Sequence, residues 1–354
     1  MNRLHVIIPA GGVGSRLWPL SRKDRPKFLL DLRMSGKSLL QETIDRLAPI
    51  AASFTIVTGR AHEQAVRAQI PQGLDVTVLV EPQGRDSMPA IGLAAYVIRQ
   101  RFGDEAPIAS FAADHAITQP QVLLDCVERA LQVAQKGYVV TIGLRPLTPS
   151  TAYGYIAPGE PFEMESPEKG SIVRSFVEKP DEETAKQYCE QGYLWNAGMF
   201  IMTAGTLARA LTRFHPDMDS HLSAIGSQWG REGFAKTLSE EWPTLTKIAI
   251  DHAIAEPLAS EGGVAVVPAT DMGWTDVGDF DALAQISSEG QALRIDSSGS
   301  FVRSLTGQKI VLVGALNMAV IATEDAILVV DRNRAQDVKH VVDQLTQSGE
   351  EELL

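Results

Sequence analysis

The sequence predicts an α/β fold with a mostly parallel, mixed sheet between helices, followed by a small all-β module. Three observations support this prediction. Short apolar runs alternate with helical patterns from Leu4 to about Gly143. The first apolar run ends in a glycine-rich turn, which is typical of a strand that leads into a ligand site. After residue 299, several short β-type runs follow one another closely.

The first 143 residues supply the parallel part of the predicted sheet. Their alternation of apolar runs and helical spacing is the pattern of successive β-α-β units. The strand candidates are His5–Ile8, Phe54–Thr58, Val76–Val80, Ile108–Phe111 and Tyr138–Ile142. The helix candidates are Leu39–Leu47, Ala61–Gln69, Ser87–Arg101 and Pro120–Gln135. Ligands of such sheets bind beyond the carboxyl ends of the strands, so we expect functional residues there. These strand exits are Gly11, Glu81, Asp114 and Gly143.

The alternation is less regular between Thr148 and about Ile286. Strands are predicted at Tyr153–Ile156, Ile172–Glu178, Leu194–Met202 and Val264–Val267. Helices are predicted at Asp181–Gln191, Thr206–Arg213 and Met218–Gly226, with another that follows Asp279 and runs through Ile286.

The last part of the chain predicts a separate, smaller module. Residues 287–299 are rich in Ser and Gly and predict a linker. The β runs that follow are Phe301–Arg303, Lys309–Val313, Ala319–Ala322 and Ile327–Val330. A helix is predicted at Ala335–Leu345, and the acidic residues Glu350–Glu352 predict a frayed end.

Composition and charge exclude several classes of function. The 354 residues are 44% hydrophobic and 21% charged, which is a globular balance with room for one large and one smaller domain. A formal net charge of −12 gives no attraction for polyanions, so we expect no nucleic-acid partner. The two cysteines, Cys126 and Cys189, form neither a metal motif nor a disulfide framework. No signal peptide or membrane-spanning run is recognisable, so we expect a cytoplasmic protein without a membrane partner.

The glycine turn after the first strand is the strongest functional signal. Gly11, Gly12 and Gly14 expose backbone N–H groups, and glycine lets a phosphate approach without steric interference. Arg16 and Lys27 add positive charge close by in the sequence. The turn therefore predicts a site for the phosphates of a nucleotide.

Two better-known phosphate loops do not fit this chain. A P-loop pattern around Gly36-Lys37-Ser38 fails, because Asp31 stands where its first glycine belongs. A dinucleotide fingerprint starting at Gly12 fails at Leu17, which disfavours a dehydrogenase. The glycines alone also fit an ordinary strand-to-helix turn, and that alternative stays open at this point.

The remaining candidate residues suit phosphoryl or nucleotidyl transfer, which depends on positioning and charge stabilisation. Asp114 and Asp276 are candidate Mg²⁺ ligands, since this ion prefers one or two carboxylates plus phosphate oxygens and water. Lys27 and Lys179, each beside a proline, are candidate cations. Each Asp is also consistent with a helix cap, and each Lys with a solvated side chain. No motif for a general base or nucleophile is recognisable, and an attacking phosphate needs neither.

Several motifs, in order, resemble those of sugar nucleotidyltransferases, and more narrowly those of bacterial mannose-1-phosphate guanylyltransferases. The matching stretches are GGVGSRLWPLSRKDRPKF at 11–28, EPQGRDSMPAI at 81–91, AADH at 112–115, PLTPSTAYGYI at 146–156, FVEKP at 176–180, WNAGMF at 195–200, AIDHAIAE at 249–256, WTDVGDF at 274–280 and AQDVK at 335–339. The resemblance implies that the protein transfers GMP from GTP to α-D-mannose 1-phosphate with Mg²⁺ as the cofactor. The products of this reaction would be GDP-mannose and pyrophosphate.

The resemblance also implies an architecture. It points to a Rossmann-like nucleotidyltransferase domain over residues 1–286, with a nucleotide half at about 1–143 and a sugar-phosphate half at about 144–286. After the linker at 287–299, residues 300–354 would form a left-handed β-helix-like module with a terminal helix. This module is expected to mediate a homodimer.

Each site residue receives a role from the same resemblance. The GTP phosphates would be held by Gly11, Gly12, Gly14, Ser15, Arg16 and Lys27. The guanine edge would meet Glu81, with Arg85 and Asp86 nearby. The sugar would be bound by Gly143, Gly154, Glu178 and Asn196, and its phosphate by Lys179. Asp114 and Asp276 would ligate Mg²⁺, and Arg16, Lys27 and Lys179 would be the catalytic cations.

The chain departs from the family pattern near the expected nucleotide site. Asp86 stands where the family usually has Asn, and Phe28 where it has Gln. Ala112 replaces a proline, and Asp279-Phe280 replaces Ser-Trp. Guanine selectivity is therefore the weaker expectation. The alternatives are guanylyl transfer to another sugar 1-phosphate, such as that of glucose or a heptose, and a non-catalytic nucleotide-sugar-binding protein.

Overall fold

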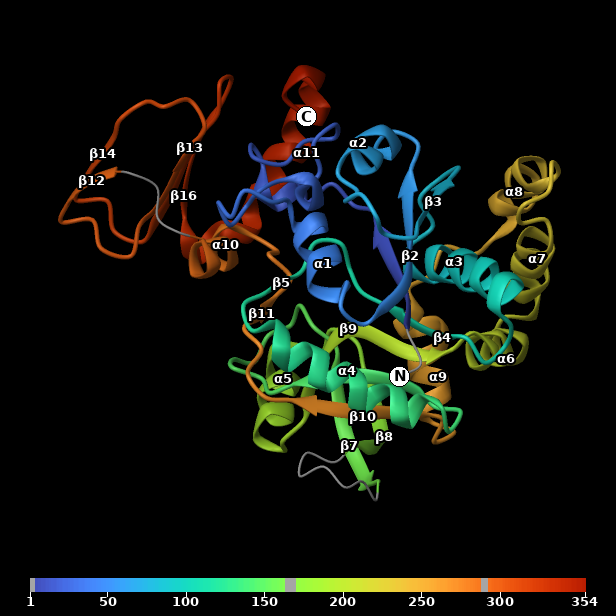
Figure 1. Cartoon of the computed structure of the whole chain (residues 1–354). Helices are drawn as coiled ribbons and strands as arrows, with labels where there is room; N and C mark the ends of the chain where they lie inside the picture. Colours follow the sequence, from blue (N-terminus) through green and yellow to red (C-terminus); the bar gives the residue numbers. More distant parts are fainter. Residues whose placement is uncertain (1–3, 163–169, 288–291) are drawn as a thin grey trace. The chain divides into compact units, whose positions relative to one another are not determined.

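The computed structural model describes residues 4–162, 170–287 and 292–354 (Figure 1). The chain divides into two compact units, each formed by several segments. The first unit comprises Met1–Gly11, Ile44–Ala112 and Thr118–Gly273. The second unit comprises Gly12–Thr43, Ala113–Ile117 and Trp274–Leu354. The helix α1, Leu39–Leu47, contains the boundary between two of these segments.

The first unit is built on a sheet that has nine strands within its described residues, in the order β3-β2-β1-β4-β9-β6-β10-β8-β7. The strands are β1 Leu4–Ala10, β2 Ala51–Gly59, β3 Val76–Glu81, β4 Pro107–Ser110, β6 Val139–Leu144, β7 Tyr155–Pro161, β8 Ser171–Val177, β9 Leu194–Thr203 and β10 Val264–Ala269. The helices are α2 Glu63–Ala68, α3 Ser87–Phe102, α4 Pro120–Ala134, α5 Glu182–Glu190, α6 Ala204–Phe214, α7 Pro216–Ser227, α8 Phe234–Glu241 and α9 Glu256–Ala259.

The sheet is mixed, as the sequence predicts. Strands β3, β2, β1 and β4 run parallel, and β6 runs parallel to β10. Strand β9 runs antiparallel to both β4 and β6, and β8 runs antiparallel to β10 and β7. The parallel strands are joined through helices because such strands need a long crossover connection. This arrangement confirms the predicted fold class.

Helix α3 anchors the core of the first unit. It is apolar nearly all round, and its residues from Met88 to Ile98 are buried. A helix of this kind must be covered on every side, and α3 packs against α6, α7 and strand β1. Its first turn is capped by Asp86, whose carboxylate accepts from the N–H of Ser87. The cap fixes where the helix begins.

The second unit combines the segment after the glycine turn with the C-terminal part of the chain. Its elements are η1 Ser15–Leu17, η2 Lys27–Leu29, β5 Ala116–Ile117, β11 Trp274–Thr275, α10 Phe280–Ile286, η5 Arg332–Asp337, α11 Val338–Ser348 and η6 Glu351–Leu353. Its apolar core joins Leu17 and Trp18 to Phe280 and Phe301. The N-terminal loop is thus held by side chains from the other end of the sequence.

The C-terminal β module repeats every 18 residues. Its strands are β12 Ala292–Ile295, β13 Phe301–Ser304, β14 Ile310–Val313, β15 Met318–Ala322 and β16 Ile327–Asp331. Strand β12 pairs in parallel with β14, and β13 with β15, each partner lying 18 residues further along the chain. Parallel pairing at a constant spacing is the geometry of successive coils of a β-helix.

The predicted linker at 287–299 is partly wrong. Residues 288–291 lie outside the described residues, but Ala292–Ile295 form strand β12. This strand is difficult to predict from the sequence, because it has only four residues and the Ser and Gly residues around it are typical of a linker. Its pairing partner β14 supplies the hydrogen bonds that such a short segment cannot supply alone.

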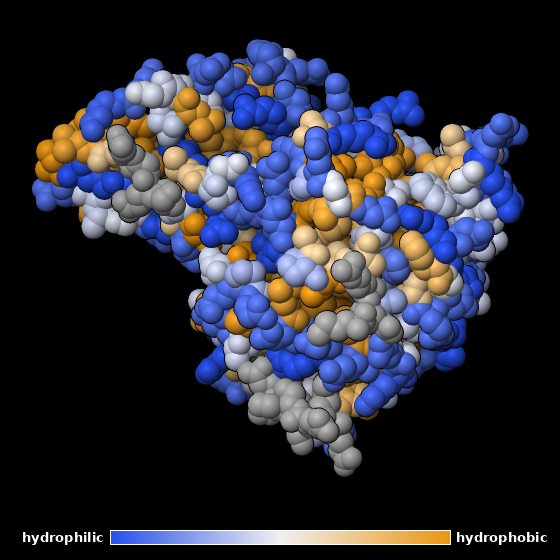
Figure 2. All heavy atoms as spheres, in the orientation of Figure 1, coloured by the Kyte–Doolittle hydropathy of each residue, from blue (hydrophilic) through white to orange (hydrophobic). Residues whose placement is uncertain are grey.

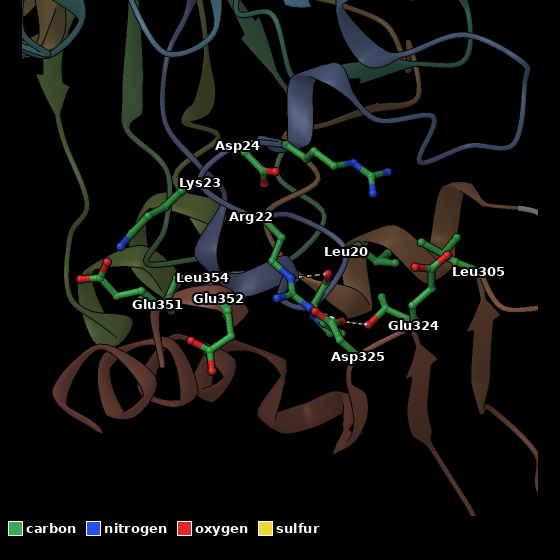
Figure 3. A pocket seen from close by; sticks show the side chains of 13 residues that line it. Leu20, Arg22, Lys23, Asp24, Leu305, Glu324, Asp325, Glu351, Glu352 and Leu354 are labelled. Atoms are coloured by element: carbon green, nitrogen blue, oxygen red, sulfur yellow. Dashed lines mark hydrogen bonds and ion pairs between the residues drawn. The ribbon is translucent and has the colours of Figure 1, made fainter. Parts of the chain in front are cut away.

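The predicted frayed end is wrong as well. Residues 351–353 form η6, and Leu354 is only 7% exposed. The indole Nε1 of Trp18 donates to the Leu353 carbonyl at 2.7 Å, and the N–H of Lys23 donates to the Leu354 carbonyl at 2.8 Å. Figure 3 shows Arg22 beside this tail, where it also pairs with Asp325 at 2.8 Å. The tail and the 19–25 loop border a cavity of about 780 Å³.

Candidate functional site

The glycine turn has the conformation that the sequence suggests. Gly12 and Gly14 adopt φ values of 80° and 78°, which side-chain-bearing residues avoid. A Cβ on Gly14 would lie 3.0 Å from the side chain of Lys27, whereas the space around Gly12 is open. Glycine is therefore needed at Gly14 for close packing, and Gly12 offers bare, accessible backbone.

Lys27 connects this turn to both candidate metal ligands. Its Nζ lies 2.8 Å from Oδ2 of Asp114 and donates to the backbone carbonyl of Asp276 at 2.7 Å. Burial alone would raise the pKa of Asp114, but the charges of Lys27 and His115 lower it below its usual value. Asp114 is thus held ionised in the second unit.

A short β ladder brings Asp114 and Asp276 together. Ala116 pairs with Thr275, so Asp114 lies two residues before one strand of the ladder and Asp276 directly after the other. Val277 follows with a φ of 48° although its side chain is fully buried and β-branched. Such strain persists only where the surroundings impose it, and it often marks a functional site. No cluster of three or more His, Cys, Asp or Glu side chains suited to a metal occurs among the described residues.

Arg16 is oriented from the C-terminal part of the chain. Its Nη1 donates to Oε1 of Gln336 at 2.7 Å, and Nε2 of Gln336 donates to Asp279. Asp279 in turn accepts from the N–H groups of Asp281 and Ala282, at 2.8 and 3.0 Å, and so caps α10. A single amide therefore connects the glycine turn to the segment that carries Asp276.

The candidate nucleobase residues lie in the first unit. Glu81 ends β3, and burial raises its pKa to about 7. Its Oε2 is buried and has no hydrogen-bond partner within the described part of the chain. Arg85 donates to the carbonyls of Leu245 and, at 2.6 Å, Pro243, so its guanidinium fixes a neighbouring loop. Asp86 has a φ of 68° and caps α3.

The candidate sugar residues also lie in the first unit. Asn196, on β9, accepts from Thr141 Oγ1 at 2.8 Å and donates to Asp251 at 2.7 Å. Glu178 is 12% exposed and pairs with Lys179 at 2.7 Å. Lys179 has a φ of 48°, an unusual value for a residue with a side chain. These residues form one polar cluster at the ends of β8 and β9.

Two glycines shape the surroundings of this cluster. A Cβ on Gly154 would collide with Oε2 of Glu178 and lie 3.5 Å from Asn196. A Cβ on Gly143 would lie 2.7 Å from the side chains of Leu194 and Val266. Gly154 therefore lets Glu178 and Asn196 pack directly against its backbone, and Gly143 permits close packing between strands. The role of Gly143 in lining a sugar site stays a prediction.

The predicted residues thus fall into two groups. The second unit contains Gly12, Gly14, Ser15, Arg16, Lys27, Asp114 and Asp276, and the first contains Gly11, Glu81, Arg85, Asp86, Gly143, Gly154, Glu178, Lys179 and Asn196. Sequence reasoning gave no role to Asp251 or Gln336. Both lie in quoted motifs, and their position beside a predicted site residue is a contact that only the fold reveals.

Comparisons with known proteins agree with this arrangement. Residues 5–292 match the family model described as nucleotidyl transferase, and residues 290–345 match the mannose-phosphate isomerase/GMP-like β-helix domain. The chain is 35% identical to a mannose-1-phosphate guanylyltransferase of Escherichia coli K12, over 99% of this chain and 75% of that protein. It is 34% identical to the xanthan biosynthesis protein XanB of Xanthomonas campestris, with the same two coverages.

Solved structures lead to the same comparison. The crystal structure of a mannose-1-phosphate geranyltransferase from Thermus thermophilus superposes with a TM-score of 0.83 at 31% identity, covering 98% of this chain and 100% of that one.

Across the described residues, no helix has the length and apolar character required to cross a bilayer.

Proposed function

Since this chain belongs to the family of mannose-1-phosphate guanylyltransferases, we propose that it transfers GMP from GTP to α-D-mannose 1-phosphate. A phosphate oxygen of the sugar phosphate attacks the α-phosphorus of GTP in line. A new P–O bond forms, the bond between the α-phosphorus and the bridging oxygen breaks, and pyrophosphate leaves. The products are GDP-mannose and pyrophosphate.

The chain's own residues position the two anions and reduce their repulsion. Gly11, Gly12, Gly14 and Ser15 receive the triphosphate, with Arg16 and Lys27 as its cations. Lys179 binds the phosphate of the sugar, and Glu178 and Asn196 hydrogen-bond its hydroxyls. Glu81 accepts from the guanine edge, with Arg85 and Asp86 nearby. No general base is needed, because the attacking phosphate is largely dianionic at neutral pH.

Nucleotidyltransferases of this kind generally use a divalent metal ion. We propose Mg²⁺, held by Asp114 and Asp276. The residue types fit, because carboxylates are the hard oxygen ligands that Mg²⁺ prefers, and Lys27 contacts both the Asp114 carboxylate and the backbone carbonyl of Asp276. When bound, the ion would neutralise charge on the phosphate oxygens.

The observation that carries the proposal is the position of Lys27. Its ammonium group contacts Asp114 and the backbone of Asp276, and its side chain packs against Gly14. A phosphate-binding turn, a cation and two carboxylate-bearing segments thus occur together in one unit. This combination supports nucleotidyl transfer better than it supports an ordinary turn.

A pyrophosphate-release assay with four nucleoside triphosphates and several sugar 1-phosphates tests the proposal. We expect the fastest release with GTP, mannose 1-phosphate and Mg²⁺. Faster release with glucose 1-phosphate or a heptose 1-phosphate would assign another acceptor. Binding of GDP-mannose without any turnover would identify a non-catalytic binding protein and would defeat the proposal.

We further propose a homodimer formed through the C-terminal β module. Strands β12 and β14 present four apolar side chains that are each about half exposed or more: Leu293, Ile295, Val311 and Val313. Leu293 pairs with Val311, and Ile295 with Val313, so the four share one face. We call this surface the β12–β14 face. A cytoplasmic location, where GTP and sugar phosphates are available, completes the proposal.

A further inference from the structure

We propose that Asp251 is a residue of the sugar-phosphate acceptor site, where it fixes the amide of Asn196 and presents a second carboxylate to the sugar hydroxyls. The inference rests on the proposed function, because it names a further residue of the same acceptor site. Asp251 opens a π-helical turn, Asp251–Ala255, directly before α9. Such turns are rare and frequently occur at functional sites.

The first step concerns Asn196, whose side chain is 7% exposed. Its Oδ1 accepts from Thr141 Oγ1 at 2.8 Å and from the N–H of Gly198 at 3.2 Å. Its Nδ2 donates to Oδ1 of Asp251 at 2.7 Å. These three contacts use both lone pairs of the oxygen and one of the two N–H groups. Asn196 therefore has one donor left for a ligand, and Asp251 determines its direction.

The second step concerns the acceptors. One free N–H cannot satisfy several sugar hydroxyls, so the site needs oxygens that accept hydrogen bonds. Oε1 of Glu178 is engaged by Lys179 at 2.7 Å. Within the described part of the chain, no other side chain donates to Oε2 of Glu178 or to Oδ2 of Asp251, and the backbone N–H of Asp251 donates to its own carboxylate. Two carboxylate oxygens are thus available beside one amide N–H.

The third step concerns space and charge. Gly154 lacks the Cβ that would collide with Glu178 and approach Asn196, so both side chains pack directly against its backbone. Burial and the nearby charge of Glu178 raise the pKa of Asp251 to about 6, while Lys179 and His252 act against that rise. The repulsion between two neighbouring carboxylates costs less when hydroxyl groups donate to them and a cation lies nearby. A phosphorylated sugar brings the hydroxyls, and Lys179 supplies the cation.

The test measures KM for mannose 1-phosphate and for GTP separately in purified full-length variants. For Asp251→Ala we expect KM for mannose 1-phosphate to rise roughly 10–100-fold, the usual effect of losing a hydrogen bond to a charged group. KM for GTP should change less than about twofold on that scale. Asp251→Asn should show a smaller rise, because its amide oxygen still accepts from Asn196 while the charge is lost.

Asn196→Ala and the double variant complete the design. If Asp251 acts partly through Asn196, the double variant should be little worse than the poorer single variant. The control is Asp219→Asn, which alters another part-buried carboxylate of the first unit, one that accepts from Thr212 at 2.7 Å. This control should leave both KM values unchanged. Thermal unfolding followed by circular dichroism checks that each variant folds, and Asp251→Asn decides the matter if Asp251→Ala does not fold.

Three outcomes would overturn the inference: unchanged KM for the sugar phosphate in both Asp251 variants, an equal rise in both KM values, or fully additive effects with Asn196→Ala. Failure of the proposed function looks different, because wild-type enzyme would then release no pyrophosphate. In that case calorimetric titration with mannose 1-phosphate replaces KM. Weaker binding by the Asp251 variants than by wild type would still support the inference, and absence of any wild-type binding would reject it.

Discussion

The pKa of Glu81 is well above that of an ordinary glutamate. Burial raises its pKa from 4.5 to about 7, so the folded protein holds a proton that the unfolded chain releases near pH 4.5. Stability must therefore fall as the pH rises from about 4.5 to 7, and stay lower above that range. Guanine offers N–H donors, which favour the ionised form of the carboxyl group.

The resulting prediction concerns Glu81→Gln. This substitution removes the ionisation cost, so its unfolding temperature should depend less on pH between about 5 and 8 than that of wild type. Differential scanning calorimetry across this range checks the slope. Equal slopes in the two proteins would show that Glu81 titrates normally. For wild type, KM for GTP should also rise as the pH falls below about 7, because the ionised acceptor is lost.

Asp114 provides a second prediction at the scale of a single residue. Asp114→Asn keeps an oxygen that can accept from Lys27 but loses the negative charge, so the fold should survive. We expect turnover to fall by at least about 100-fold, as when a charge-stabilising group is removed from an active site. Asp343→Asn, on the exposed side of α11, is the control. Near-normal Mg²⁺-dependent turnover in Asp114→Asn would remove this residue from the proposed metal site.

Element η5 explains why the C-terminal part of the chain matters to the glycine turn. Gln336 accepts from Arg16 and donates to Asp279, which caps α10. This chain of contacts depends on Asp279, which replaces the serine of the family pattern. A helical segment near residue 336 therefore orients an arginine near the start of the chain.

The corresponding prediction is that Gln336→Leu weakens catalysis through Arg16. The leucine side chain is similar in size but cannot accept from the guanidinium group, so kcat/KM for GTP should fall roughly 5–20-fold, by about the energy of one hydrogen bond. In an Arg16→Ala background the same substitution should cost almost nothing further. Additive losses in the double variant would show that Gln336 acts independently of Arg16.

Elements with strong local periodicity could be predicted from the sequence, and those defined by distant partners could not. Helix α1 begins and ends at the predicted residues, and α3 differs by one residue, because apolar spacing and caps are local signals. The central position of β9 between β4 and β6 depends on pairing across many residues. Strand β12 escaped prediction for the same reason.

The same distinction holds for the site. The glycine turn, Lys27 and Asp114 could be singled out because residue type and motif indicate phosphate chemistry, and the structure brings them together, while their roles stay predictions. The contacts of Arg85 could not, since its guanidinium reaches carbonyls about 160 residues away. Asp251 was missed although it lies in the AIDHAIAE motif, because only the fold brings its carboxylate beside Asn196. The division into domains at residues 286 and 300 stays a prediction.

At the scale of the whole molecule, the C-terminal β module carries most of the large apolar side chains that are exposed among the described residues. Figure 2 shows hydrophobic atoms over the part of the chain that Figure 1 labels β12 and β14. Val313 is 67% exposed and Leu293 is 50% exposed, on strands that lie side by side. Contiguous apolar surface of this kind usually marks an interaction site. A second copy of the chain is the occupant that we propose.

The prediction is that Val313→Glu disrupts the dimer. Burying a charge in the centre of an apolar interface is costly, so light scattering should show a dimer for wild type and a monomer for the variant. Gln308→Glu adds the same charge outside the β12–β14 face and should remain dimeric. A monomeric wild type at the same concentration would contradict the role of this face.

The last residues of the chain contact the 18–23 loop through hydrogen bonds from Trp18 and Lys23, and this contact can be followed experimentally. Trp18 is 7% exposed, and its indole Nε1 donates a hydrogen bond to the carbonyl of Leu353. Its fluorescence should therefore respond to whether residues 351–354 are in place. Of the five tryptophans, only Trp18 and Trp274 belong to the second unit. A red shift in emission upon deletion of those residues, absent in Trp18→Phe, would provide an optical signal for the state of the loop that leads to Lys27.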